Sequence, residues 1–192
     1  MRRTVATLLV ASGVASAEPA PEAVDGQAIS ADLGVAGGGR VTPGGLRIAG
    51  HFLYQLSDRD WFDGGASFTY GGGSAQCFRD RADQFVCEHG FADGKAIELV
   101  ASLRRWYAPQ GAFHPFLRAG VGLALVGFSA DSVSGLAFPL HAGGGVRAEV
   151  IPGFAIVVQA DVELGVGVFN HALGIEPQAG AAVLAGAEFR LP

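Results

Sequence analysis

The chain has 192 residues, a formal net charge of −5, a 49% share of hydrophobic residues and 30 glycines. This length fits one domain. The acidic balance argues against nucleic acid as a partner, because phosphate backbones attract lysine and arginine. Lys95 is the only lysine in the chain. Soluble surfaces usually carry many lysines, so we expect something other than water to cover a large apolar surface.

Residues 1–17 contain the three parts of a secretory signal peptide in the right order. Two arginines stand near the start, residues 5–14 are mostly apolar, and "ASA" is a cleavage site of small residues. We expect cleavage after Ala17, followed by a short N-terminal segment at 18–25. The alternative is a buried N-terminal helix, since the apolar stretch is too short to span a membrane. Export would leave 11 of the 13 basic residues against 18 acidic ones, a net charge of about −7.

Residues 154–169, "FAIVVQADVELGVGVF", alternate between two kinds of side chain. Every even-numbered position is apolar, whereas the odd-numbered positions include Gln159, Asp161 and Glu163. A period of two predicts a β-strand whose faces meet different surroundings. The same alternation predicts seven further strands, at 28–37, 46–57, 61–70, 96–107, 116–128, 138–151 and 180–191.

Eight such strands predict an all-β domain over residues 26–192, an eight-stranded antiparallel up-and-down transmembrane β-barrel. Each predicted strand has roughly the length that crosses a bilayer at a tilt. The barrel must close, because an open sheet edge in hydrocarbon leaves backbone groups without hydrogen bonds. The alternative is a soluble, lipocalin-like carrier whose apolar face lines a ligand cavity, since periodicity alone does not say which face is inside.

The distribution of side chains favours the membrane barrel over the carrier. The apolar faces carry no charge at mid-strand, and the polar faces are rich in small residues, which suits a narrow lumen. Aromatic residues gather near the strand ends, as in the two bands at bilayer interfaces. One band is expected to contain Tyr54, Trp61, Phe62, Trp106, Tyr107, Phe113, Phe154 and Phe189, and the other Phe68, Tyr70, Phe128, Phe138 and Phe169.

The connections between the predicted strands form two sets. The shorter set lies at 58–60, 109–115 and 152–153, and the longer set at 71–95, 129–137 and 170–179. Outer-membrane barrels have short periplasmic turns and longer external loops. We therefore expect the second set to face the outside of the cell.

Two cysteines, Cys77 and Cys87, lie in the longest predicted loop. Thiols of an exported protein usually pair, so we expect a disulfide that staples this loop. The alternative is a metal site that includes His89, but this spacing is not that of a standard zinc site. We expect no metal and no cofactor.

The predicted lumen carries charges of both signs, which should pair because unpaired buried charges are unfavourable. We expect these pairs to fill the narrow lumen, and the alternative is a polar path for a small solute or ion. The candidate lumen residues are Asp32, Arg47, His51, Asp63, Glu98, Arg104, Arg118, His141, Arg147, Glu149, Asp161, Glu163, Glu188 and Arg190.

Two stretches carry a resemblance to a known family. "PFLRAGVGLAL" is similar to the strands, and "GAEFRLP" to the C-terminal strand, of the small eight-stranded OmpA-like or OmpW-like barrels of Gram-negative bacteria. The resemblance implies an outer-membrane location. It also implies outer-membrane lipid and the barrel-assembly machinery as partners. The family usually ends on Phe or Trp, whereas here Phe189 stands three residues before the end.

The expected role is structural or interaction-related and non-enzymatic. Loop 71–95, long and charged, is the expected contact site for an extracellular partner, since exposed loops carry recognition. The enzymatic alternative is a lipid A-modifying barrel, which needs a serine beside a histidine. Its candidate residues are His51, Ser67, Ser129, Ser132, Ser134, His141 and His171.

Overall fold

The computed structural model describes residues 26–79, 82–107, 112–170 and 173–192. The expected signal peptide, the segment 18–25 and His171 lie outside these residues. Within them, no helix is long and apolar enough to cross a membrane. The strands are β1 (Gln27–Gly38), β2 (Gly45–Gln55), β3 (Asp60–Tyr70), β4 (Gln76–Arg79), β5 (Phe85–Glu88), β6 (Gly94–Trp106), β7 (Phe113–Phe128), β8 (Val133–Ile151), β9 (Phe154–Phe169) and β10 (Gly174–Arg190).

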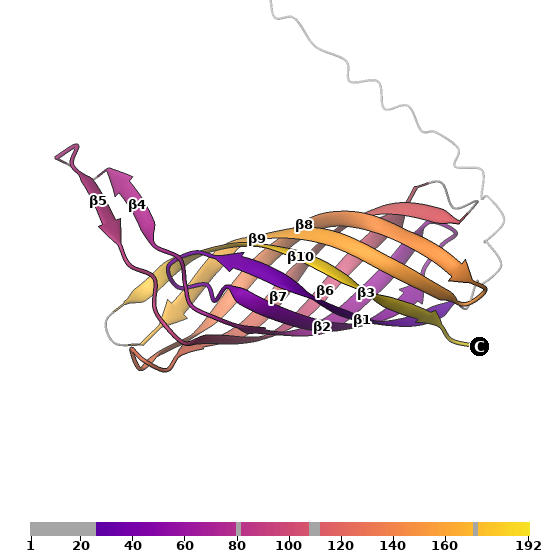
Figure 1. The fold of residues 1–192 in the computed structure, drawn as a ribbon, viewed down its shortest axis with the longest axis horizontal. Helices are drawn as coiled ribbons and strands as arrows, with labels where there is room; N and C mark the ends of the chain where they lie inside the picture. Colours follow the sequence, from indigo (N-terminus) through magenta and orange to yellow (C-terminus); the bar gives the residue numbers. More distant parts are fainter. Residues whose placement is uncertain (1–25, 80–81, 108–111, 171–172) are drawn as a thin grey trace, which may run out of the picture.

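Eight of these strands close a barrel in the order β1-β10-β9-β8-β7-β6-β3-β2 (Figure 1). Every neighbouring pair is antiparallel, and pairs such as Ile29 with Phe189 join the first strand to the last. Closure gives the backbone groups of every strand partners on both sides, which a strand in hydrocarbon requires. The predicted eight-stranded up-and-down barrel is confirmed.

The side chains on the two faces of each strand meet opposite surroundings. On β9, Val162 and Leu164 point outward with 51% and 62% of their surface exposed, whereas Asp161 is 6% exposed in the lumen. An exterior of this kind suits lipid, and a charged interior does not suit an apolar ligand. The soluble carrier alternative is therefore wrong.

Three strands begin three or more residues earlier in the chain than predicted. β7 begins at Phe113, β8 at Val133 and β10 at Gly174, so the predicted loops 129–137 and 170–179 are largely strand. In the β8 extension the inward side chains of Val133 and Ala137 are apolar and buried, so polar and apolar residues do not alternate there. The extensions of β7 and β10 instead bury His114 and Gln178. Among the connections that the structure describes in full or in part, the segment between β3 and β6 is the one long loop.

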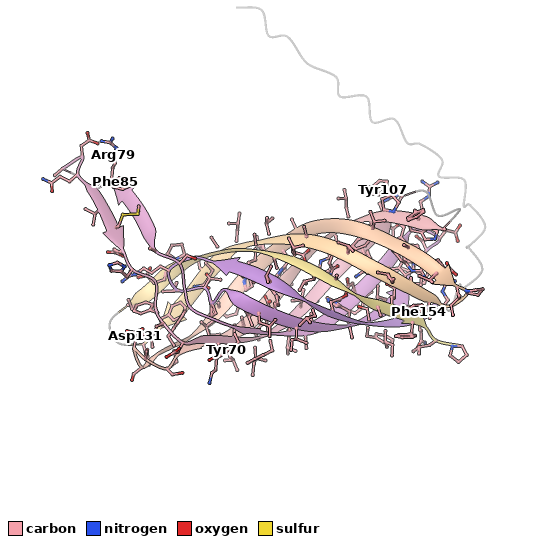
Figure 2. The ribbon with its side chains drawn as sticks, viewed as in Figure 1. Tyr70, Arg79, Phe85, Tyr107, Asp131 and Phe154 are labelled. Carbon is pink, nitrogen blue, oxygen red and sulfur yellow. A yellow bond between two sulfur atoms is a disulfide. The ribbon has the colours of Figure 1, made fainter. Side chains whose placement is uncertain are left out.

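Within that loop, β4 and β5 form a separate two-stranded sheet that projects beyond the barrel (Figure 1). The C-terminus lies at the opposite end of the barrel. We call these two ends the hairpin end and the terminus end. Cys77 pairs with Cys87 across the hairpin and forms a disulfide, which confirms the predicted staple. Figure 2 shows Arg79 and Phe85 near the free end of the hairpin.

Two apolar clusters lie inside the barrel, one toward each end. The hairpin-end cluster is centred on Phe128 and Phe169, and the terminus-end cluster on the stacked rings of Trp61 and Trp106. The other members are Val41, Ala124, Val126, Val133 and Ala137 at the hairpin end, and Ala28, Leu53, Phe116 and Val157 at the terminus end.

Four of the aromatic residues assigned to the interfacial bands are therefore misplaced: Trp61, Trp106, Phe128 and Phe169 face the lumen with at most 5% of their surface exposed. The alternation along the strand places these rings correctly in the lumen, because Trp61 lies on the same face of β3 as Asp63. The strand-end position of these rings was the misleading signal. Most of the other predicted band members are outward and exposed: Tyr54, Phe62, Phe68, Tyr70, Tyr107, Phe113, Phe138 and Phe189.

Candidate functional site

The space between the two apolar clusters holds charged side chains from all eight barrel strands. Most of the predicted lumen residues lie here and are buried: Asp32, Arg47, His51, Asp63, Glu98, Arg104, Arg118, His141, Arg147, Asp161 and Glu188. Glu149 and Glu163 are half-buried. The prediction that Arg190 lies in the lumen is wrong, because this residue is exposed at the end of β10. Its guanidinium carbon lies 5.8 Å from the Trp61 ring centre.

The network nearest the terminus end is built on two arginines. Arg104 Nη2 donates to Asp63 Oδ2 at 2.8 Å, and its Nη1 donates to Glu188 Oε2 at 3.2 Å. Arg147 Nε donates to the other oxygen of Glu188 at 2.6 Å and its Nη1 to Glu149 at 3.1 Å. Arg104 thus links β6 to β3 and β10, and Arg147 links β8 to β10.

A second group continues the network toward the middle of the lumen. Arg118 donates two parallel hydrogen bonds of 2.7 Å to Asp161, the strong bidentate form of this pair. His51 Nδ1 lies 2.8 Å from Asp63 Oδ1, and its Nε2 lies 3.3 Å from Asp32 Oδ2. Both ring nitrogens of this histidine therefore face carboxylates.

The third group lies on the hairpin side of the network. Arg47 forms ion pairs with Glu98 and, at 3.1 Å, with Glu163. Ser67 Oγ accepts from Arg47 Nη2 at 3.1 Å and lies 3.3 Å from Glu98 Oε2. His141 Nε2 lies 2.7 Å from the other Glu98 oxygen. One guanidinium, two carboxylates and one imidazole therefore meet here.

Inward-facing glycines make room for these polar side chains. A Cβ on Gly122 would lie 2.5 Å from Glu98 Oε1 and 2.8 Å from His141 Nε2. A Cβ on Gly180 would lie 2.5 Å from a Glu163 oxygen. Contacts this short would force the side chains to move, so glycine at these positions leaves the space that they occupy. The polar faces are glycine-rich because a lumen of eight strands must also accommodate long charged side chains.

The β1–β2 connection folds into the hairpin end of the lumen, which the sequence did not indicate. Val41 and Thr42 are 1% and 5% exposed. Thr42 Oγ1 donates to Gln178 Oε1 at 2.9 Å, and Gln178 Nε2 donates to the Val41 carbonyl at 3.3 Å. A cavity of about 20 Å³ is lined by Thr42, Pro43, Arg47, Glu98, Glu163 and Gln178, among other residues. This volume is large enough for about one water molecule.

The residues considered for catalysis are distributed between the lumen and the rim. Ser67, His51 and His141 are buried in the charged network. Ser129 and Ser134 lie at the hairpin-end rim, where Ser129 bonds to the Asp93 carbonyl and Ser134 to Asn170. Each of these side chains thus contacts polar groups other than a serine–histidine partner. His114 is also buried. The sequence did not identify it as a buried residue, because its position was assigned to the predicted turn 109–115.

No family model and no curated protein matches the sequence. The structure is similar to that of Neisserial surface protein A (NspA), with a TM-score of 0.65 and 15% identity over 86% of this chain and 97% of NspA. It is also similar to outer membrane protein OprG from Pseudomonas aeruginosa, with a TM-score of 0.56 and 12% identity over 87% of this chain and 96% of OprG. The chain has the fold of the small eight-stranded outer-membrane barrels.

Outer-membrane barrels of this fold differ in what they do, so the fold by itself does not assign an activity. The lumen and the hairpin of this barrel therefore carry the information about its function.

Proposed function

We propose that the protein is a non-enzymatic outer-membrane barrel with a closed lumen, which uses the β4–β5 hairpin to contact a partner outside the cell. The observation that carries the proposal is the filling of the lumen. An apolar cluster lies toward each end, and the charged network occupies the space between them. Water-filled pores belong to wider barrels, whereas eight strands leave room for little more than side chains.

Ion pairing supports a structural rather than a conducting lumen. Arg104 and Glu188 are each at most 2% exposed, and each has a charged partner. A solute crossing the barrel would have to separate such pairs, and an unpaired buried charge is strongly unfavourable. It would also have to displace the Trp61–Trp106 stack, whose ring centres lie 4.8 Å apart.

The hairpin has the features of a recognition element. Phe85 is 71% exposed, and Arg79 and Asp83 form an exposed ion pair of 2.9 Å near the turn. The hairpin base is held by Arg40, which pairs with Glu88 at 2.9 Å. Exposed loops held by a rigid scaffold are common sites of recognition. A stapled loop also loses less conformational entropy on binding.

Among the described residues, the arrangement of polar groups in the lumen argues against hydrolysis by Ser67 together with His141. Ser67 Oγ bonds to Arg47 and lies beside Glu98, while His141 bonds to the other side of the same glutamate. These residues are enclosed in the lumen, whereas a lipid substrate would meet the outer surface. The nucleophile needs a base within hydrogen-bond reach and access to substrate.

The exterior fits the remaining proposed partners. Outward residues such as Val162 and Leu164 supply a surface for outer-membrane lipid. Phe189, on the last strand, is 49% exposed on the outside of the barrel. That position is compatible with recognition of the terminal strand by the barrel-assembly machinery, which we retain as a proposed partner.

The proposal is tested with two measurements on the full chain. Purified folded barrel is expected to give no conductance steps in planar bilayers, and discrete steps would contradict the closed lumen. Cells that display the wild type are compared with cells in which 74–90 is replaced by a short Gly-Ser turn. Adhesion to epithelial layers, cell aggregation and phage adsorption are measured.

Loss of one of these three interactions in the hairpin variant, at equal surface display, supports the proposed contact. Phe85→Ser serves as a milder variant that keeps the disulfide. Equal behaviour of the wild type and the hairpin variant in all three assays contradicts the interaction role. A change in lipid A masses that depends on expression of the chain contradicts the non-enzymatic role.

A further inference from the structure

Three neighbouring strands bring metal-ligating side chains together inside the barrel. They are Glu98 of β6, His141 of β8 and Glu163 of β9, and one ligand atom from each lies within 4.8 Å of the other two. We propose that this triad binds a divalent transition-metal ion of the zinc type. Imidazole nitrogen and carboxylate oxygen are the ligands that such ions accept. This site is independent of the role proposed for the hairpin.

The distances require only small side-chain movements. Ligand atoms about 2.1 Å from a tetrahedral zinc ion lie roughly 3.4 Å from one another. His141 Nε2 is 2.7 Å from Glu98 Oε1, so these two groups would open slightly. The remaining separations, at most 4.8 Å, would close by up to roughly 1.4 Å. Gly122 leaves the space in which Glu98 and His141 meet.

The charge of the cluster favours an added cation. Glu98 and Glu163 carry two negative charges, and Arg47 pairs with both of them. When His141 is neutral, as a ligand must be, the four groups together carry one net negative charge. Glu98 is 4% exposed and His141 is 3% exposed, so water screens this charge poorly. Arg47 acts as a resident competitor that would weaken metal binding.

The cavity beside the carboxylates completes the site. Its volume is about 20 Å³, and both Glu98 and Glu163 line it together with Thr42 and Thr69. One water molecule fits there and could serve as a fourth ligand. Thr42 belongs to the segment that folds into the hairpin end of the lumen, so the site lies beneath this segment and is enclosed by the barrel.

The experiment measures zinc binding to the purified barrel in detergent. The protein is stripped with a chelator, titrated with Zn²⁺ by calorimetry, and analysed for bound metal after dialysis. We expect one zinc ion per chain. His141→Gln and Glu163→Gln should weaken binding by about 100-fold or more, since losing even a group behind a ligand weakens metal sites by about 10–100-fold.

Two further variants separate this site from adventitious binding. His51→Gln removes another buried lumen histidine that also faces carboxylates, and it should leave the zinc affinity unchanged. His89→Gln removes a histidine outside the lumen and should also leave it unchanged. Arg47→Gln removes the competing guanidinium, so the affinity should rise. A gain of this kind does not arise from general damage to the fold.

Folding of each variant is checked by the heat-dependent shift of its band on SDS gels. The thermal unfolding midpoint is then measured with and without Zn²⁺. The wild type should gain stability with zinc, and His141→Gln should not. The proposal is overturned if the stripped wild type binds no zinc. It is also overturned if His141→Gln binds as tightly as the wild type, or if Arg47→Gln leaves the affinity unchanged or lowers it.

Discussion

Trp61 and Trp106 stack inside the barrel, with ring centres 4.8 Å apart and planes inclined by 17°. They are the only tryptophans in the chain. Arg147 lies over Trp106 and Arg190 over Trp61, with guanidinium carbons 5.4 Å and 5.8 Å from the ring centres. The stack is therefore flanked by two cations, an arrangement that stabilises aromatic rings. It narrows the lumen toward the terminus end.

The stack predicts that lipid does not reach either indole. In vesicles of brominated phospholipid, tryptophan fluorescence of the wild type should remain close to its value in unbrominated vesicles. The positive control is Phe68→Trp in a chain with Trp61→Phe and Trp106→Phe, because Phe68 is 40% exposed on the outside. Strong quenching of the wild type would show that the indoles face the bilayer.

Gly143 is predicted to be intolerant of any side chain. A Cβ there would overlap Asp161 Oδ1 and would lie 2.5 Å from the Ala160 carbonyl oxygen, which belongs to the backbone. Gly143→Ala should lower the free energy of unfolding by about 1–3 kcal/mol, the usual effect of overpacking. The measurement is the urea midpoint of the folded barrel in detergent.

The matched control is Gly50→Ala. Gly50 lies mid-strand on the outward face, where the nearest atom to an added Cβ is the Ser30 carbonyl oxygen at 3.8 Å. This variant should unfold near the wild-type midpoint. Equal midpoints for the two alanine variants would contradict the account of inward glycines as space for carboxylates.

Arg104 is predicted to be the most sensitive arginine of the terminus-end network. Its side chain is fully buried and contacts Asp63 and Glu188. Arg104→Gln should lower the free energy of unfolding by about 3–5 kcal/mol, because it leaves buried carboxylates with less compensation. Adding Glu188→Gln to this variant should recover part of the loss.

The control is Arg79→Gln in the hairpin. Arg79 and Asp83 pair at 2.9 Å, but their side chains are 67% and 81% exposed. Exposed pairs contribute about 0–1 kcal/mol, so this variant should stay within that range of the wild type. A loss for Arg104→Gln no larger than for Arg79→Gln would mean that the lumen pairs are solvated.

The disulfide between Cys77 and Cys87 is predicted to stabilise the hairpin and not the barrel. The two residues are 10 apart in sequence, and their strands pair only with each other. Closing a loop of this size is worth about 3 kcal/mol or a little less. The double variant Cys77→Ser/Cys87→Ser should keep the wild-type unfolding midpoint of the barrel while protease cleaves within 74–90 much faster.

Wild type treated with a reductant is the control for the cysteine substitutions and should behave like the double variant. A large drop in the barrel midpoint in either sample would contradict the independence of the two parts. Unchanged protease resistance would contradict the stabilising role of the disulfide.

The alternation of apolar and polar side chains predicted most of the fold. In β9, the positions of Val162 and Asp161 follow directly from a period of two, and the same parity places Trp61 with Asp63 in the lumen. Barrel closure followed from the requirement that backbone groups in lipid have partners. The disulfide was predicted from two cysteines in a chain that we expect to be exported. Alternation and the two cysteines are visible in the sequence itself, and closure follows from the strands together with the membrane.

Only the tertiary structure decided which lumen charges meet. Arg104 and Glu188 are 84 residues apart in sequence, and their contact depends on how eight strands wrap around one axis. The structure also shows that Val41 and Thr42 are buried in the hairpin end of the lumen, where Val133 belongs to an apolar cluster. Both features depend on contacts between several strands. The triad of Glu98, His141 and Glu163 arises in the same way. The alternation along a strand determines which face of the sheet a side chain occupies. The partners of that side chain across the lumen are determined by the closure and stagger of the whole sheet.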